Sequence, residues 1–223
     1  MFNLNKRLIL LLQKMNMTDY NNKQIQILQV TEKLFAEKGF DGTSIRDISK
    51  EAKINIAMVS YYLGSKEKLL ESLILYRTAN LKVQLENIYE EQLSPIEKID
   101  KYVDLYIQKI NSNKELYQIL HFEISSKKRA MDLKSFTEVK KGNLVTLTKI
   151  IEEGQSLNIF KKDIKIPLLT TTIIGTYIHF QNNKPFYVEI LDLDTDEKYN
   201  SYIKIDLINH IKQTIKALLI HEN

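Results

Sequence analysis

The chain has 223 residues, of which 43% are hydrophobic and 27% are charged, as in a folded protein with one large or two small domains. Six glycines and three prolines, against abundant Leu, Ile, Lys and Glu, favour helix throughout. The absence of cysteine excludes disulfides and thiol chemistry and makes the cytoplasm the expected compartment.

The positive charge is unevenly placed along the chain. Residues 1–80 hold 12 Lys and Arg against 8 Asp and Glu, whereas the remaining 143 residues hold 20 of each. Because phosphate groups attract cations, this excess gives minor support to nucleic-acid binding by the N-terminal part.

Residues 1–21 are predicted to form an N-terminal extension. Its apolar run, Leu8 to Leu12, is too short for a signal peptide, and no stretch of the chain reaches the length of a membrane span. The extension is either a frayed amphipathic segment or a helix that packs on the following domain or tracks a DNA groove. Residues 22–38 follow as the first strong amphipathic helix, which Gly39 ends.

The stretch 43–70 has the pattern of a helix-turn-helix. Thr43 or Ser44 can cap a first helix whose apolar residues recur at helical spacing. A turn at residues 53–55 leads into a second helix, 56–63, of the kind that enters a DNA major groove.

Three segments in order make this pattern more specific. They are LFAEKGF at 34–40, GTSIRDI at 42–48 and YYLGSKEKL at 61–69. Over about residues 24–72 the chain resembles the DNA-binding domain of the TetR family of bacterial transcriptional regulators. The chain departs from the residues usual in that family at Lys53, Ile56, Ala57, Met58, Ser60 and Leu63. Most of these departures alter the reading surface, so the operator sequence does not carry over from relatives.

Apolar periodicity predicts six further helices and one long loop. The helices are expected at 66–89, 95–111, 115–126, 133–155, 168–181 and 199–220, and the loop at 182–198. The helix 66–89 is expected to link two domains physically. The predicted fold is therefore all-α. The resemblance implies a three-helix DNA-binding domain at 22–70 and a helical ligand-binding and dimerisation domain at 71–223.

The last two predicted helices favour a homodimer. The segment 168–181 carries no charged residue and lacks a polar face, so it should be covered on nearly all sides. Pairing both helices with their copies gives a four-helix interface, in which Thr171 and Gly175 would allow close approach. The alternative is that both are ordinary core helices of a monomer.

A helix-turn-helix dimer needs phosphate contacts that fix its position and base contacts that specify the sequence. Candidates from position and from the resemblance are Thr43, Ser44, Arg46, Asn55, Ile56, Ala57, Ser60, Tyr61, Tyr62 and Lys66.

Thr43 and Lys66 begin helices, and the hydroxyls of Tyr61 and Tyr62 can also reach phosphates. Tyr62 equally suits the core by its spacing, and Arg46 can reach a phosphate or pair with a local acid. Asn55, Ala57 and Ser60 are placed for base contacts, and Ile56, Ala57 or Met58 can touch a thymine methyl group.

By the same resemblance the second domain is a ligand sensor. Its candidate lining residues are Tyr102, Tyr106, Tyr117, His121, Phe122 and Tyr177. Aromatic residues at helical spacing more often belong to an ordinary core. His121 and His179 lie far apart without cysteine, so neither a metal nor a cofactor is expected.

The sequence contains no nucleophile elbow, no glycine-rich phosphate loop and no His-Glu pair at metalloenzyme spacing, which argues against an enzyme. The helix-turn-helix pattern and the resemblance to the TetR family together predict a homodimeric transcriptional repressor that binds a pseudo-palindromic operator and that a small molecule releases. The alternative is a ligand-independent helical DNA-binding protein with an architectural or partner-recruiting role.

Overall fold

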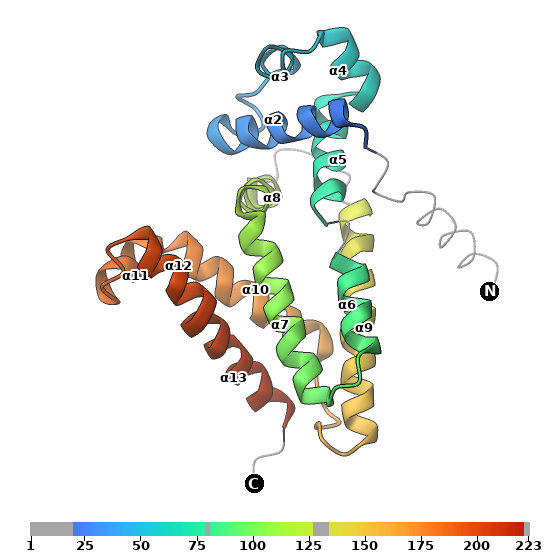
Figure 1. Ribbon diagram of the computed structural model, residues 1–223, viewed down its shortest axis with the longest axis vertical. Coiled ribbons are helices and arrows are strands. Elements are labelled where there is room, and N and C mark those ends of the chain that lie inside the picture. Colours follow the sequence, from blue (N-terminus) through green and yellow to red (C-terminus); the bar gives the residue numbers. More distant parts are fainter. Residues whose placement is uncertain (1–19, 79–80, 127–133, 221–223) are drawn as a thin grey trace, which may run out of the picture. The chain divides into compact units, whose positions relative to one another are not determined.

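The computed structural model describes residues 20–78, 81–126 and 134–220, with the side chains of 121–126 and 134–135 excepted. The predicted N-terminal extension therefore lies outside the described residues except for its last two. The described ranges contain helices and no strand, which confirms the all-α prediction (Figure 1). In chain order the elements are α2 (Asn22–Lys38), α3 (Ile45–Ala52), α4 (Ile56–Leu63), α5 (Lys66–Thr78), α6 (Leu81–Glu90), α7 (Pro95–Ser112), α8 (Lys114–Ser126), α9 (Lys134–Ser156), α10 (Ile166–Asn182), α11 (Lys184–Ile190), α12 (Asp196–Tyr202), the π-helical segment η1 (Ile203–Leu207) and α13 (Ile208–Leu219).

The chain divides into two compact units. The first comprises residues 1–80 and 113–139, and the second comprises residues 81–112 and 140–223. The predicted helix 66–89 is described as α5 and α6, which belong to different units and flank residues 79–80, outside the described ranges. The predicted domain boundary after Leu70 remains a prediction.

The first unit is built on α2. Asn21 caps this helix: its Oδ1 accepts from the Gln24 N–H at 3.0 Å, while the Gln24 side chain accepts from the Asn21 N–H at 3.0 Å. One side of α2 packs on the short helices α3 and α4, and α8 also packs against α2 (Figure 1). The buried apolar residues that join these helices include Ile27, Leu28, Phe35, Ile48, Val59, Leu69, Leu116 and Ile119.

The turn between α3 and α4 is closed by a left-handed residue. Lys53 has φ 53° and ψ 41°, and its N–H donates to the carbonyl of Lys50 at 3.2 Å. Ile54 is buried as the apolar plug of the turn, and the Ser49 hydroxyl donates to its carbonyl at 2.6 Å. Side chain, backbone and core thus fix the path from α3 into α4.

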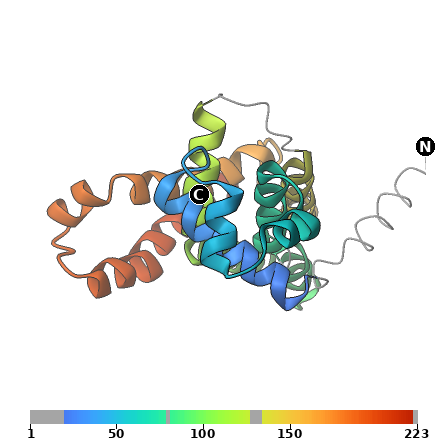
Figure 2. The same cartoon turned by 90° about the horizontal axis from the view of Figure 1, so that it is seen from above.

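The second unit packs α13 and α10 against α7. Two ion pairs join α13 to α7, from Lys212 to Asp104 at 2.7 Å and from Lys216 to Asp100 at 3.2 Å. Figure 2 shows the orange α10 and the red α12 and α13 as neighbouring arms joined through α11. None of the helices in the described parts of the chain is long and apolar enough to cross a bilayer.

The segment predicted as a loop, 182–198, contains the two-turn helix α11, so that prediction is wrong in part. Pro185 lies in the first turn of this helix. Backbone N–H groups there have no partner within the helix, so the missing N–H of proline costs no hydrogen bond. Proline near a cluster of acids is compatible with a loop or with a helix start, and the short apolar run Phe186–Val188 is too brief to show a helical period.

The last predicted helix is interrupted by the π turn η1, where the Ile208 N–H donates back to the Ile203 carbonyl. In an unbroken α-helix the buried residues from Tyr199 to Leu219 would spread over about 200°. The extra residue in a π turn brings them within about 100°, so that both segments face one core. Ile205 and Leu218 are exposed.

Candidate DNA-binding surface and effector site

The outer face of α4 is formed by apolar and small residues. Val59 and Leu63 point into the core, and Tyr62 is half-buried. The exposed fractions are 45% for Ile56, 41% for Met58 and 84% for Tyr61, and Ala57 and Ser60 are also exposed. At about 100° per residue, Ala57 and Tyr61 lie near the middle of this face, with the others on its flanks.

Asn55 fixes the beginning of α4. Its Oδ1 accepts from the Ala57 N–H at 2.8 Å, as an N-cap residue does. Gly64 ends the helix with φ 75°, where its N–H donates to the Ser60 carbonyl at 2.9 Å. The helix predicted to read bases is therefore held at both ends.

Lys66, predicted to contact a phosphate, also stabilises the fold of the first unit. Its ammonium donates to the carbonyls of Phe40 at 2.8 Å and Thr43 at 2.9 Å. The same nitrogen lies 4.3 Å from the centroid of the Phe40 ring, in a cation–π contact. Lys66 thus ties the start of α5 to the turn between α2 and α3, and an ammonium has one further proton for a phosphate.

The Thr43 hydroxyl, which was predicted to suit a phosphate, is engaged inside the protein. The side chain is buried, and the hydroxyl is placed to donate to the carbonyls of Leu34 at 3.1 Å and Gly39 at 2.9 Å. A hydroxyl has one proton, so the two carbonyls share it and none remains for DNA.

Ser44, rather than Thr43, caps α3, and its hydroxyl is also occupied. Its Oγ accepts from the Asp47 N–H at 3.1 Å and donates to the Asp47 carboxylate at 2.5 Å. These bonds from Ser44 lower the pKa of the Asp47 carboxyl. Because a carboxylate repels phosphate, the Ser44 hydroxyl is poorly placed for a phosphate contact, and DNA binding by Ser44 stays a prediction.

The remaining cations near these helices are exposed. Among the described residues Arg46 has no ion-pair partner, so the predicted alternative of pairing with a local acid is not realised. Lys50, Lys53 and Lys68 are also exposed, and sequence reasoning did not single them out. These lysines could have been identified as candidate DNA contacts from the sequence, because they lie within or next to the helix-turn-helix in a positively charged segment.

Three of the predicted effector residues lie in the second unit, and all three are buried. Tyr102 and Tyr106 on α7 stack with ring centroids 5.4 Å apart. Tyr177 on α10 donates to Asn111 Oδ1 at 2.6 Å and accepts from Gln181 at 2.9 Å, so its hydroxyl is fully engaged.

Among the residues that the structure describes, the buried Tyr102 hydroxyl has no hydrogen-bond partner. Burial raises the pKa of Tyr102 well above its usual value, and the Thr170 hydroxyl offsets this only in part. The Thr170 hydroxyl and Asn143 Oδ1 are also buried without a partner, although Asn143 donates to the Tyr106 hydroxyl at 3.3 Å. Sequence reasoning missed Asn143 and Thr170, because isolated polar residues on apolar helices carry no periodic signal.

The other predicted lining residues do not join this group. Tyr117 belongs to the first unit, and the side chains of His121 and Phe122 lie outside the described part of the chain. Phe180, a further aromatic residue of α10, packs between two other rings, with centroids 4.5 Å from Tyr187 and 5.4 Å from Tyr199.

Comparison with known proteins identifies the chain. Residues 27–73 match the family described as bacterial regulatory proteins, tetR family, and residues 95–204 match the tetracyclin repressor-like C-terminal domain. The transcriptional repressor NicS of Pseudomonas putida is 30% identical over 184 residues, which cover 77% of this chain and 82% of that protein. The chain belongs to the TetR family.

Solved structures agree with this assignment. The hemolysin II transcriptional regulator HlyIIR is 28% identical, with a TM-score of 0.57 over 90% of this chain and 98% of that one. FadR from Bacillus subtilis, in complex with stearoyl-CoA, has a TM-score of 0.68 at 20% identity, over 88% of this chain and 99% of that one, which shows a common fold. This TetR-family chain is a DNA-binding transcriptional regulator and not an enzyme.

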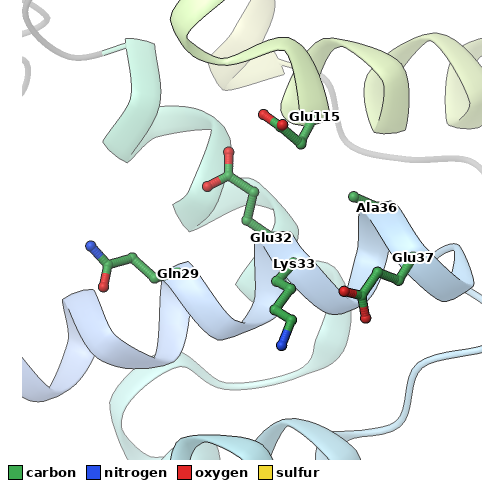
Figure 3. Close-up of a pocket in the computed structure, with 6 residues that line it drawn as sticks. All are labelled: Gln29, Glu32, Lys33, Ala36, Glu37 and Glu115. Atoms are coloured by element: carbon green, nitrogen blue, oxygen red, sulfur yellow. The ribbon is translucent and has the colours of Figure 1, made fainter.

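A polar hollow of about 360 Å³ lies on the first unit of this TetR-family protein, between α2 and α8. Figure 3 shows Glu32 of α2 and Glu115 of α8 extending toward the space between the helices, while Lys33 points away. Its lining residues are Gln29, Glu32, Lys33, Ala36, Glu37 and Glu115. The hollow lacks the aromatic lining predicted for an effector, and Glu32 is already paired with Arg77.

Proposed function

We propose that this protein is a homodimeric repressor whose α4 helices read the two halves of a pseudo-palindromic operator, and that a small molecule releases it. The observation that carries the proposal is the exposed outer face of α4, on a helix fixed by Asn55 and Gly64. The net positive charge of residues 1–80 supports DNA as the partner. Such a protein acts where the chromosome is, which in a bacterium is the cytoplasm.

The proposed contacts to DNA follow from what is exposed. Tyr61 is the most exposed candidate, and its hydroxyl suits a phosphate at the rim of the groove. The third proton of Lys66 completes the phosphate contacts, with Tyr62 at the half-buried edge, and the exposed Arg46 reaches the DNA from α3. Ala57 and Ser60 approach the base edges, as do Asn55, Ile56 and Met58.

A dimer through α10 and α13 is supported by their uncovered faces. Leu168, Thr171 and Gly175 are exposed along α10 at spacings of three and four residues. A Cβ added at Gly175 would meet no atom within 4 Å, so that side of α10 has room for a second helix. Ile205 of η1 and Leu218 of α13 are also exposed apolar residues.

Gly175→Glu tests this interface. A glutamate favours an exposed helix more than glycine does, so the protomer should fold at least as well. Sedimentation should show a monomer, and operator binding should weaken because the second half-site no longer adds to the first. A Gly175→Glu dimer of unchanged stability would place the interface elsewhere.

The proposed effector site surrounds Tyr102 and Tyr106, with Asn143 and Thr170. Unpaired buried hydroxyl and amide oxygens destabilise a fold unless a ligand or water satisfies them. A mainly apolar molecule with one polar group would meet this need. The relative crystallised with stearoyl-CoA supports a ligand that combines an apolar chain with a polar part.

The effector part is tested by thermal unfolding with stearoyl-CoA and a panel of small aromatic and aliphatic acids. A ligand at one hundred times its Kd should stabilise the protein by about 2.7 kcal/mol. Tyr102→Phe should remain folded and reduce the effect of any active compound. If no compound shifts unfolding or operator binding, release by a small molecule is refuted.

The DNA-binding part is tested by selecting sites from fragmented genomic DNA and titrating salt on the best fragment. A pseudo-palindrome bound far more tightly than random DNA is expected, and Tyr61→Ala should weaken its binding without dissociating the dimer. Sequence-indifferent binding with a steep salt dependence would instead support the architectural alternative.

A further inference from the structure

The outer face of α4 is unusual for a surface that reads DNA, because it has no long polar side chain. The helix sequence IAMVSYYL contains no Arg, Lys, Asn or Gln. Its exposed side chains carry only two hydrogen-bonding groups, the hydroxyls of Ser60 and Tyr61. Ile56 and Met58 nevertheless remain 45% and 41% exposed, although burial in the protein core would stabilise them more.

Hydrogen-bonded reading of purines is therefore restricted. A bidentate contact to adenine needs both the oxygen and the nitrogen of an Asn or Gln side chain. Asn55 Oδ1 already accepts from the Ala57 N–H at 2.8 Å, so such a contact would remove the cap of α4. Bidentate contact to guanine is left to Arg46 on α3, which is exposed.

Apolar contact is a second way to distinguish base pairs in the major groove. Thymine is the base that presents a methyl group there. Ala57, near the middle of the face, is small enough to let α4 approach the base edges closely. Ile56 and Met58, on its two flanks, then reach methyl groups on either side.

We infer that the operator half-sites are thymine-rich and that Ile56, Ala57 and Met58 recognise them through the thymine methyl groups. This inference rests on the proposed function, since it names the chemistry by which α4 selects its operator. Ser60 and Arg46 then supply the hydrogen bonds of the half-site.

Deoxyuridine tests the inference directly, because it lacks the thymine methyl group and keeps the same base pairing. The duplex selected from genomic DNA is resynthesised with deoxyuridine at one thymine of each half-site in turn. Each contacted methyl group should contribute about fourfold in Kd, the equivalent of roughly 0.8 kcal/mol for one buried methyl-sized group. Changing the same position in both half-sites should weaken binding roughly fifteenfold, and deoxyuridine outside the half-sites should change nothing.

Alanine variants show which side chains cause the preference for thymine over deoxyuridine. Ile56→Ala and Met58→Ala should each reduce the fourfold preference for thymine to nearly one at a single position. Val83→Ala, at a site 55% exposed on α6, is the matched control and should keep the preference.

The outcomes separate two failures. If selection returns no preferred sequence, the proposed function itself fails. If a specific operator is found but its half-sites lack thymine, or bind equally well with deoxyuridine throughout, the operator assignment stands and the methyl readout is overturned.

Discussion

The ion pair between Glu32 on α2 and Arg77 on α5 should contribute far more stability than its neighbour on the same helix. Arg77 Nε donates to both carboxylate oxygens of Glu32, at 3.0 and 3.2 Å, and its terminal nitrogen makes a further short bond. The Glu32 side chain is 9% exposed and that of Arg77 is 30% exposed. Next to it, Lys33 pairs with Glu51 at 3.1 Å, but those side chains are 57% and 49% exposed.

Removing one member of a buried pair destabilises a protein by roughly 3–5 kcal/mol, because the other charge is left without compensation. Glu32→Gln leaves Arg77, which water can still reach, so we expect the smaller loss of about 2–3 kcal/mol. Arg77→Met leaves the more deeply buried Glu32 carboxylate, so we expect about 3–4 kcal/mol. Lys33→Met should change stability by no more than about 0.5 kcal/mol, as exposed pairs do.

Urea unfolding followed by circular dichroism at pH 7 measures these differences, and the double variant Glu32→Gln/Arg77→Met gives the coupling between the two groups. We expect the double variant to lose roughly 1.5–3 kcal/mol less than the two single losses added together. If Glu32→Gln is no more destabilising than Lys33→Met, or if the two single losses simply add, the argument from burial is refuted.

Three further changes test other parts of the structure. Lys66→Met should destabilise the first unit by about 2 kcal/mol in urea unfolding, because two backbone carbonyls lose a charged donor; an unchanged midpoint would show that these bonds contribute nothing. Gly154→Ala should lower the free energy of unfolding by about 1–3 kcal/mol, since the added Cβ would lie 2.1 Å from the buried Phe160 ring; a neutral result would mean that the ring moves aside freely. Stability should fall between pH 10 and about 12, because burial raises the pKa of Tyr199 to about 12 and the unfolded chain therefore loses its proton first. Tyr199→Phe should flatten this fall in thermal unfolding from pH 9 to 12, and an unchanged slope would contradict the assignment.

The helix-turn-helix was predictable from sequence because its signals are local. Hydroxyl and amide caps lie next to the helices they start, and the apolar residues that pack α3 and α4 are a few positions apart. The roles of Thr43 and Lys66 were not predictable in the same way. Both side chains donate to backbone carbonyls of a turn whose path depends on the folded unit, which a residue pattern does not record.

The second unit shows what periodicity omits. The π turn shifts the phase of the last helix, and a regular helical period does not record such a shift. The aromatic residues were identified from their type, but their partners decide their roles. The Tyr177 hydroxyl on α10 has hydrogen-bond partners within the chain. The Tyr102 hydroxyl on α7 has none among the described residues.

The π turn at η1 also determines where the length of this chain can change during evolution. Loss of one exposed residue, such as Lys204 or Asp206, would convert η1 to regular α-helix and leave α13 facing the same core. The same loss two turns later would rotate the remainder of α13 by about 100° and expose Ile215 and Leu219. Aligned relatives should therefore differ from this chain by a single-residue gap within 203–207, and a gap inside α13 should be accompanied by a new apolar pattern after it.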